Sequence, residues 1–249
     1  MRLAGEVAIV TGAAQGLGAA IADALESEGA RVGRTDIRGA EIELDVRDRA
    51  SVEHAVEEVV RTLGEPTILV NNAGLSRFGP SETLPEEHWQ LVVDVDLTGV
   101  FRCSQVVGAR MLAAGRGAIV NIASVAAQTG FPGRVAYSAA KAGVVGLTRT
   151  LGSEWASRGV RVNAVAPGYV RTALVEHALE SGFLSEEGVR WRTPAGDLAA
   201  PAQIAAAVVF LASPEASYIT GETLFVDGGY NAYGAPAPAS TRIEPITYT

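Results

Sequence analysis

The sequence predicts a single α/β domain built on a doubly wound, seven-stranded parallel sheet with helices on both faces. Short β-branched runs alternate with longer segments of helical periodicity along most of the chain. The strand runs are almost continuously apolar, which is typical of parallel strands buried between helices. The 249 residues, 48% of them hydrophobic, suffice for one buried core, and no linker-like composition precedes residue 230.

The expected elements follow one another in a regular order. Strands are predicted at 6–11, 31–35, 41–44, 67–70, 118–123, 160–166 and 223–226, and helices at 17–28, 51–63, 85–114, 135–157 and 201–212. Too few residues separate Asp36 from Asp45 for a normal crossover helix, so only the short strand is expected there. Asp48 or Ser51 would cap the helix that follows. The stretch 172–199 is charged, amphipathic and expected to be irregular.

A glycine-rich turn joins the first strand to the first helix. Gly12, Gly16 and Gly18 permit the positive φ angles and close backbone approach that a pyrophosphate needs, and the helix N-terminus adds a partial positive charge. Asp36 ends the second strand, where its carboxylate would accept hydrogen bonds from ribose hydroxyls and repel a 2′-phosphate. The pattern therefore predicts NAD, although Arg34 and Arg38 nearby leave NADP open.

Tyr137 and Lys141 lie four residues apart in a predicted helix and so share one face. The chain has 20 lysines and arginines together, and Lys141 is the only lysine, which suggests that this position needs a compact ammonium. A phenol has a pKa of about 10, and an adjacent ammonium lowers it. Tyr137 can then serve as a general base or acid.

Several motifs occur together, in one order. They are Thr11-Gly12-x-x-x-Gly16-x-Gly18, Asn71-Asn72-Ala73-Gly74, Ser124, Tyr137-x-x-x-Lys141 and Pro167-Gly168-x-x-x-Thr172. Over residues 3–230 the chain resembles the classical short-chain dehydrogenases/reductases. The resemblance implies a Rossmann fold, binding of a nicotinamide dinucleotide, and hydride transfer between a secondary alcohol and its ketone.

The resemblance also implies roles for individual residues. Ser124 would hold the substrate oxygen, and Lys141 would bind the cofactor ribose as well as tune Tyr137. The remaining cofactor contacts would come from the glycine turn, the second strand end and three later loops: Gly12, Gln15, Gly16, Leu17, Gly18, Asp36, Asp45, Val46, Asn72, Ala73, Gly74, Pro167, Gly168, Val170 and Thr172. Among these, Asp45 and Val46 would meet the adenine, and Val170 and Thr172 the nicotinamide carboxamide.

Asp96 departs from the family pattern, which usually has asparagine at this position. In the family the backbone carbonyl of that residue anchors a water linked to the lysine, and its side chain steadies a helix irregularity. Asp96 keeps the carbonyl, and its carboxylate would favour Lys141 as a cation. We expect the hydride chemistry to be retained and the proton relay to be altered.

The motifs and the resemblance together predict an NAD-dependent oxidoreductase acting on a sugar, polyol or other hydroxy compound. The substrate would be enclosed by residues 126–134, the residues after Gly74, and a lid at about 172–199. Hydroxyacyl thioesters and cyclic or aromatic alcohols remain possible substrates. Alternatives are an NADPH-dependent 3-oxoacyl-(acyl-carrier-protein) reductase and, less favoured, a nucleotide-binding protein that has lost catalysis.

Composition limits the classes of binding partner and the cellular location that we expect. A net charge of -8 argues against nucleic acid or an anionic membrane as main partner. The N-terminus has no signal-peptide pattern. Cys103 is the only cysteine, so it cannot form an internal disulfide, and it is expected to be buried. A cytoplasmic protein is therefore expected. The histidines show no metal-ligand spacing, so no metal is expected. The resemblance implies a homotetramer with two long helices as contacts.

The last residues, 231–249, are rich in alanine and proline and carry no periodicity. They would form either a disordered tail or an arm that crosses a neighbouring subunit. Tyr233, Ile243, Ile246 and Tyr248 would give such an arm apolar contacts.

Overall fold

A seven-stranded parallel sheet forms the centre of the molecule. The structure is a computed structural model, and it describes residues 1–180, 182 and 184–235. The strand order is β3-β2-β1-β4-β5-β6-β7, and all neighbouring pairs are parallel. The strands are β1 (Val7–Thr11), β2 (Arg31–Asp36), β3 (Ile42–Glu43), β4 (Ile68–Asn71), β5 (Gly117–Ile122), β6 (Val160–Pro167) and β7 (Thr223–Val226). The order reverses between β1 and β4, and the loops after these two strands diverge there to leave a crevice.

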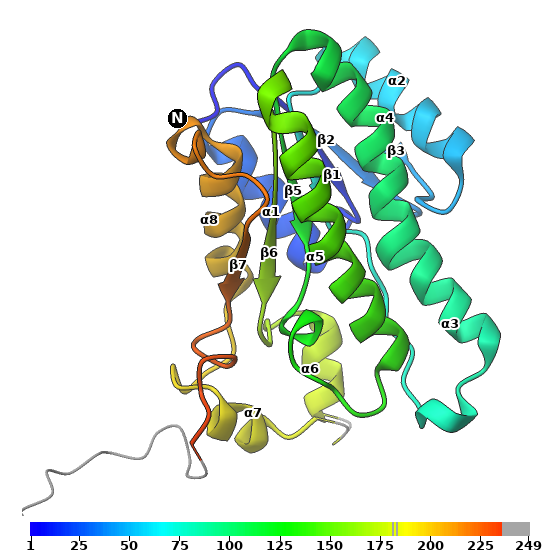
Figure 1. Ribbon diagram of the computed structural model, residues 1–249, viewed down its shortest axis with the longest axis vertical. Helices are drawn as coiled ribbons and strands as arrows, with labels where there is room; N and C mark the ends of the chain where they lie inside the picture. Colours follow the sequence, from blue (N-terminus) through cyan, green and yellow to red (C-terminus); the bar gives the residue numbers. More distant parts are fainter. Residues whose placement is uncertain (181, 183, 236–249) are drawn as a thin grey trace, which may run out of the picture.

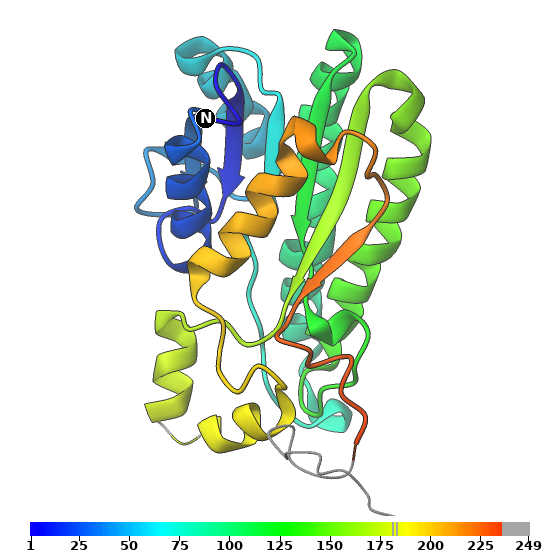
Figure 2. The same ribbon diagram turned by 90° about the vertical axis from the view of Figure 1, so that its left-hand side faces the viewer.

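Helices cover both faces of the sheet (Figures 1 and 2). On one face lie α1 (Gly16–Ser27) and α8 (Pro201–Ala212), and on the other α2 (Arg49–Leu63), α4 (Gly99–Ala114) and α5 (Val135–Trp155). Beyond the carboxyl ends of the strands lie α6 (Ala173–Glu180) and α7 (Glu186–Arg192). Smaller pieces are α3 (Glu86–Val93), η1 (Ser81–Thr83), η2 (Asp94–Thr98), η3 (Val125–Ala127), η4 (Ala156–Arg158) and η5 (Pro214–Ala216).

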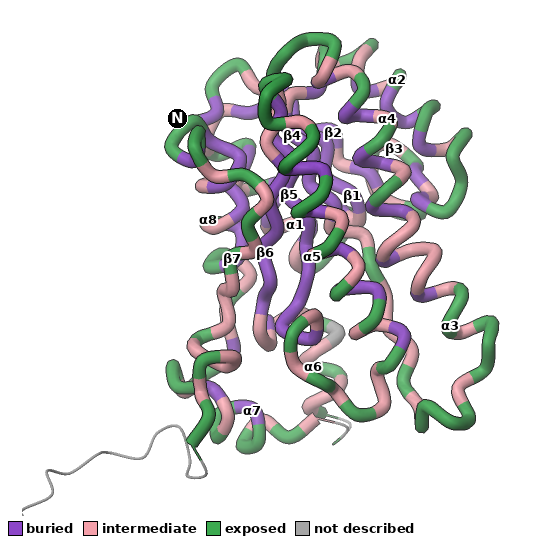
Figure 3. Tube along the Cα trace, viewed as in Figure 1, coloured by how far each residue is buried: buried purple, intermediate pink, exposed green. Residues whose placement is uncertain are grey.

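The core has two halves because successive strand residues point to opposite faces. Ala8 and Val10 of β1 belong to the cluster packed under α1 and α8, whereas Val7 and Ile9 belong to the cluster under α2, α4 and α5. All five residues of β1 are buried (Figure 3). A strand buried on both sides requires a continuous apolar run, which explains why these strands lack the alternation of half-exposed ones.

The structure confirms the predicted fold class, and most predicted boundaries differ by one or two residues. Asp48 rather than Ser51 caps α2, because its carboxylate accepts a hydrogen bond from the Ala50 N–H. Ser51 instead accepts one from the Asp45 N–H. Residues 37–41 connect β2 to β3 without a helix, as expected.

Two expectations need correction. The single helix predicted over 85–114 is divided by a π-helical turn, η2, between α3 and α4. The stretch 172–199 was expected to be irregular and instead holds α6 and α7. For α7 the local signals were present: Ser185 caps it, acidic residues occupy the first turn and arginines the last. Because the stretch 172–199 is rich in charged residues, these helix signals were not recognised in the sequence.

The segment after β7 contacts the body of the domain as far as Tyr233. Thr129 Oγ1 hydrogen-bonds Asn231 Oδ1, and Arg192 Nη1 donates to the Tyr233 carbonyl. Residues 236–249, with Ile243, Ile246 and Tyr248, lie outside the described residues. The proposed inter-subunit arm therefore stays a prediction.

Candidate active site

Two adjoining cavities open at the carboxyl edge of the sheet. One, of ≈ 310 Å³, is bounded by the η3 loop, the start of α5 and the lid. The other, of ≈ 630 Å³, runs from the glycine turn to Asp36, Asp45 and Val46. They share Leu17, Asn72, Gly74, Leu75 and Thr172. We call them the substrate cavity and the cofactor groove. A ligand spanning both would pass over the β1–β4 switch point.

The glycine turn can be occupied only by glycine at its critical positions. A Cβ at Gly18 would lie 2.1 Å from the Gly12 carbonyl oxygen, and Gly12 and Gly16 have φ of +68° and +59°. Asn72 fixes this turn, since its Nδ2 donates to the carbonyls of Thr11 and Gly12 at 2.9 and 3.0 Å. The compact turn and the open α1 N-terminus fit a pyrophosphate.

Asp36 lies in the cofactor groove beyond the glycine turn. Its Oδ2 accepts a hydrogen bond from the Ala14 N–H at 3.1 Å, so the carboxylate is oriented by the turn itself. Arg34 points away and binds Asp23 and Glu26 of α1 at 2.5 and 2.8 Å. Arg38 is exposed, and only its backbone contacts Asp36.

Asp45 and Val46 line the far part of the groove, where adenine was expected. Asp45 is paired with Arg47 at 2.6 Å, and this hydrogen-bonded partner lowers the pKa of its carboxyl. Because Arg47 occupies both carboxylate oxygens, Asp45 is better suited to shaping the groove than to binding a ligand through its side chain.

Ser124, Tyr137 and Lys141 line the substrate cavity together. Ser124 follows β5, and its Oγ accepts from the Ala126 N–H at 3.1 Å, which leaves the hydroxyl proton free to bind an oxygen in the cavity. The Lys141 Nζ lies 5.5 Å from the centroid of the Tyr137 ring. Pro167, Gly168, Val170 and Thr172 close the side nearest β6.

The sequence-predicted residues therefore divide between the two sites. Asn72, Gly74, Leu17 and Thr172 line both cavities, and Gly12, Gln15, Gly16, Gly18 and Ala73 line the groove alone. The donor and acceptor groups of this groove fit a nicotinamide dinucleotide whose nicotinamide end would face Tyr137.

Asp96 contacts Lys141 directly. The Asp96 Oδ2 lies 3.2 Å from the Lys141 Nζ, and both side chains are almost completely buried. The other carboxylate oxygen accepts from the Leu75 N–H at 2.8 Å, and Nζ donates to the Ile122 carbonyl at 2.9 Å. The Lys141 ammonium thus donates one hydrogen bond to a backbone carbonyl and pairs its charge with Asp96.

Burial and pairing act in opposite directions on this pair. Burial raises the pKa of the Asp96 carboxyl, although Lys141 acts to lower it. Burial acts to lower the pKa of Lys141, but the charges of Asp96 and Tyr137 outweigh it, and the net pKa is raised. The charge of Asp96 therefore favours Lys141 as a cation.

Sequence reasoning missed a buried polar chain behind the site. The Asn71 Nδ2 donates to Ser104 Oγ and to Asn121 Oδ1, at 3.0 and 2.8 Å, and the Asn121 Nδ2 donates to Thr148 Oγ1 at 2.9 Å. These bonds tie β4 and β5 to α4 and α5, and α5 carries Tyr137 and Lys141. The signal was available, since asparagine within an apolar strand requires buried partners.

Aromatic rings line the outer part of the substrate cavity. Phe131 and Tyr169 lie in its wall, and Tyr230 packs behind them, with centroids 6.0 Å from Phe131 and 6.1 Å from Tyr169. Burial raises the pKa of the Tyr169 hydroxyl, against the opposing charge of Arg134. The expected walls, namely 126–134, the residues after Gly74 and the lid, all contribute.

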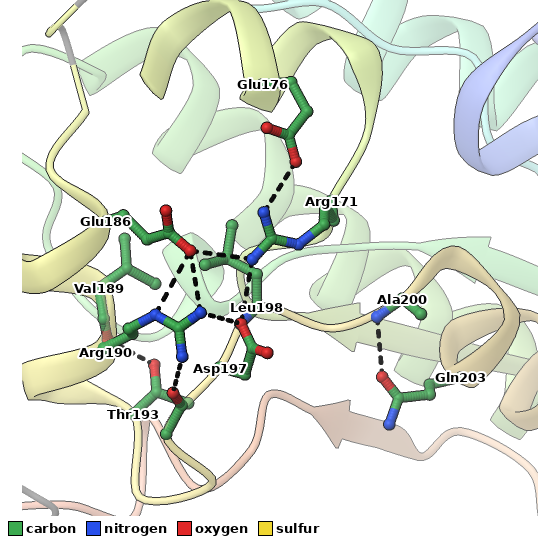
Figure 4. A network of polar contacts seen from close by, with 11 residues as sticks. Arg171, Glu176, Glu186, Val189, Arg190, Thr193, Asp197, Leu198, Ala200 and Gln203 are labelled. Carbon is green, nitrogen blue, oxygen red and sulfur yellow. Dashed lines mark hydrogen bonds and ion pairs between the residues drawn. The ribbon is translucent and has the colours of Figure 1, made fainter. Parts of the chain in front are cut away.

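An ion-pair network fastens the lid at its base (Figure 4). Arg171 binds Glu176 of α6, Glu186 of α7 and Asp197, at 2.9, 2.9 and 3.1 Å. Arg190 binds the same Glu186 and Asp197. Both lid helices are therefore attached to the chain segments that enter and leave the lid.

In residues 1–180, 182 and 184–235, no group of three or more His, Cys, Asp or Glu side chains is arranged to hold a metal ion. None of the helices in this part of the chain combines the length and hydropathy of a membrane-spanning helix.

Comparison with known proteins identifies the family of this chain. A family model described as enoyl-(acyl carrier protein) reductase matches residues 12–231. D-threitol dehydrogenase of Mycolicibacterium smegmatis is 44% identical over 92% of this chain and 94% of its own. The chain belongs to the classical short-chain dehydrogenase/reductase family.

Other members of the family are also similar. The 3-oxoacyl-(acyl-carrier-protein) reductase of Thermotoga maritima is 39% identical over 92% of this chain and 99% of its own. The crystal structure of a gluconate 5-dehydrogenase from Burkholderia cenocepacia, in complex with NADP and tartrate, superposes with a TM-score of 0.89 at 33% identity. It covers 94% of this chain and 98% of that one. As a short-chain dehydrogenase/reductase, this protein is an oxidoreductase.

Proposed function

We propose that this short-chain dehydrogenase/reductase oxidises a secondary alcohol of a polyol, sugar or other hydroxy compound to the ketone, with NAD as cofactor. The observation that carries the proposal is the presence of Ser124, Tyr137 and Lys141 in one cavity that adjoins a groove ending at Asp36. Relatives named as threitol and gluconate dehydrogenases support the substrate class.

Each residue has a role in this reaction. Ser124 donates a hydrogen bond to the substrate oxygen and holds it beside Tyr137. Tyr137 accepts the hydroxyl proton during oxidation and returns one during reduction. The charge of Lys141 stabilises the phenolate, and an ammonium donor not used by the Ile122 carbonyl would bind a ribose hydroxyl. A bound nicotinamide would accept the hydride.

The preference for NAD rests on the position of Asp36. Its carboxylate at the groove end would repel a 2′-phosphate, and Arg34 is occupied by Asp23 and Glu26. Arg38 is the basic residue that would favour NADP, which is bound in the related gluconate 5-dehydrogenase structure. The alternative function is NADPH-dependent reduction of a 3-oxoacyl thioester, supported by the relative named for that activity.

Steady-state rates with NAD and NADP, on polyols, aldonates and a 3-oxoacyl thioester, test the proposal. Tyr137→Phe should lower kcat by about 10²- to 10⁴-fold, because the general base is removed. Tyr218→Phe, at a fully exposed tyrosine, is the matched control. Asp36→Ala should improve kcat/KM for NADP relative to NAD. Turnover of only the thioester, with NADPH, would establish the alternative, and tight NAD binding without any turnover would indicate a protein that has lost catalysis.

We also propose a cytoplasmic homotetramer. Phe101 on α4 is 42% exposed, an unusual position for a large aromatic side chain, and it would be covered at a subunit contact. Light scattering coupled to size exclusion should give the mass of four chains, and Phe101→Glu should shift it downward. A wild-type monomer would contradict the assembly.

A further inference from the structure

Arg134 lies in the wall of the substrate cavity, directly before α5. It is three residues from Tyr137, which lines the same cavity. Its guanidinium carbon stands 4.7 Å from the Phe78 ring centroid and 5.6 Å from that of Phe131. Two aromatic faces thus hold the guanidinium by cation–π attraction while its N–H groups stay available.

The charges in the cavity wall do not balance. Its charged residues are Asp96, Lys141 and Arg134, and the first two form an ion pair. Within the part of the chain that the structure describes, no carboxylate lies within ion-pair distance of Arg134. By contrast, Arg2, Arg34, Arg110, Arg171 and Arg190 each bind at least one carboxylate. Among the described residues, therefore, one cation borders the cavity without a countercharge.

A second polar group in the same wall also lacks a partner. The buried Ser76 Oγ makes no hydrogen bond to any residue that the structure describes. A buried hydroxyl without a partner is costly, and a ligand oxygen would satisfy it. Together the two residues add a cation, Arg134, and a hydroxyl group, Ser76, to the wall of the cavity that contains Ser124 and Tyr137.

We propose that Arg134 is a specificity-determining residue that binds an anionic terminal group, a carboxylate or a phosphate, on a hydroxylated substrate. The planar guanidinium matches the paired oxygens of either group and forms charge-assisted hydrogen bonds with them. The inference rests on the proposed alcohol oxidation and assigns its substrate class as aldonates or sugar phosphates.

Matched substrates and variants test the inference. The substrates are glucitol, gluconate and glucitol 6-phosphate, with threitol and threonate as a four-carbon pair. The variants are Arg134→Gln, Arg134→Lys and the control Arg158→Gln, which removes the same charge from an exposed residue of η4. Wild-type enzyme should prefer an anionic member of each set. Arg134→Gln should lower kcat/KM for it by about 10- to 100-fold, mainly through KM.

The control variants and substrates distinguish loss of anion binding from a general loss of activity. Arg134→Lys should recover part of the loss, neutral polyols should change less than about twofold in Arg134→Gln, and Arg158→Gln should resemble wild type. Preference for gluconate over glucitol 6-phosphate identifies a carboxylate, and the reverse a phosphate. Equal losses on neutral and anionic substrates, or a wild-type preference for the neutral members that Arg134→Gln leaves unchanged, would overturn the inference.

A binding measurement tests the anion site even if the proposed reaction does not take place. If no substrate is oxidised, calorimetry of gluconate and glucitol 6-phosphate with the NADH-saturated protein still reports on Arg134. Binding of either anion that is weakened in Arg134→Gln but not in Arg158→Gln supports the anion site. Absent or unchanged binding of both rejects it.

Discussion

Asp96 shows how one side chain can alter a reaction centre that is otherwise typical of its family. An asparagine there would be neutral, whereas the carboxylate pairs with Lys141 at 3.2 Å in a buried setting. Each charge is stabilised mainly by the other, since water is excluded. The pair keeps Lys141 cationic but reduces the positive potential that this cation exerts on Tyr137. The cost is a weaker stabilisation of the phenolate.

Asp96→Asn should therefore move the activity profile to lower pH. The charge of Asp96 raises the pKa of Lys141, so removing the carboxylate lets burial lower that pKa and the ammonium is lost at lower pH. The alkaline limb of kcat/KM for alcohol oxidation should therefore shift to lower pH. The amide oxygen still accepts from the Leu75 N–H, so the fold should persist.

Asp94→Asn is the matched control for this measurement. Asp94 lies in the same π-helical turn but bonds Gln90 instead of Lys141, so its variant should keep the wild-type pH profile. An alkaline limb in Asp96→Asn that stays in place or moves to higher pH would contradict the account.

At the scale of elements, the lid depends on charges that remain partly exposed. Arg171 is 36% exposed and its partners more so, which means that solvent and salt screen the network. Such pairs contribute little to global stability. Their geometry nevertheless joins α6, α7 and the segment before α8 at one arginine (Figure 4).

Arg171→Gln should loosen the lid rather than unfold the protein. We expect KM for the alcohol to rise several-fold at low ionic strength, with a smaller difference from wild type at about 1 M salt. The thermal midpoint should change little. Arg61→Gln, which breaks the Arg61–Glu58 pair on α2, is the control and should leave KM unchanged. A KM effect independent of salt would argue against an electrostatic role.

At the scale of the whole molecule, Cys103 reports on the integrity of the core. It is 2% exposed and packs in the cluster under α2, α4 and α5. Burial raises the pKa of its thiol to about 12. A reactive thiolate therefore requires opening of the core.

Cys103 should resist thiol reagents at neutral pH until the domain unfolds. Labelling with a chromogenic disulfide across a denaturant series should follow the loss of helical circular dichroism, because one domain unfolds as a unit. Rapid labelling of the native protein, or labelling well before the spectroscopic transition, would show that this half of the core opens separately.

The sequence by itself determined the sheet, the glycine turn and the spacing of Tyr137 and Lys141. These features are local: strand and helix periodicity, a turn that admits only glycine, and two residues one helical turn apart. Contacts between distant segments could not be read in this way. Tertiary structure decided that the Asp96 carboxylate meets Lys141, and that Arg134 borders the cavity with no carboxylate of the described residues within ion-pair distance. Each depends on where separate elements bring their side chains together, and no sequence period encodes that placement.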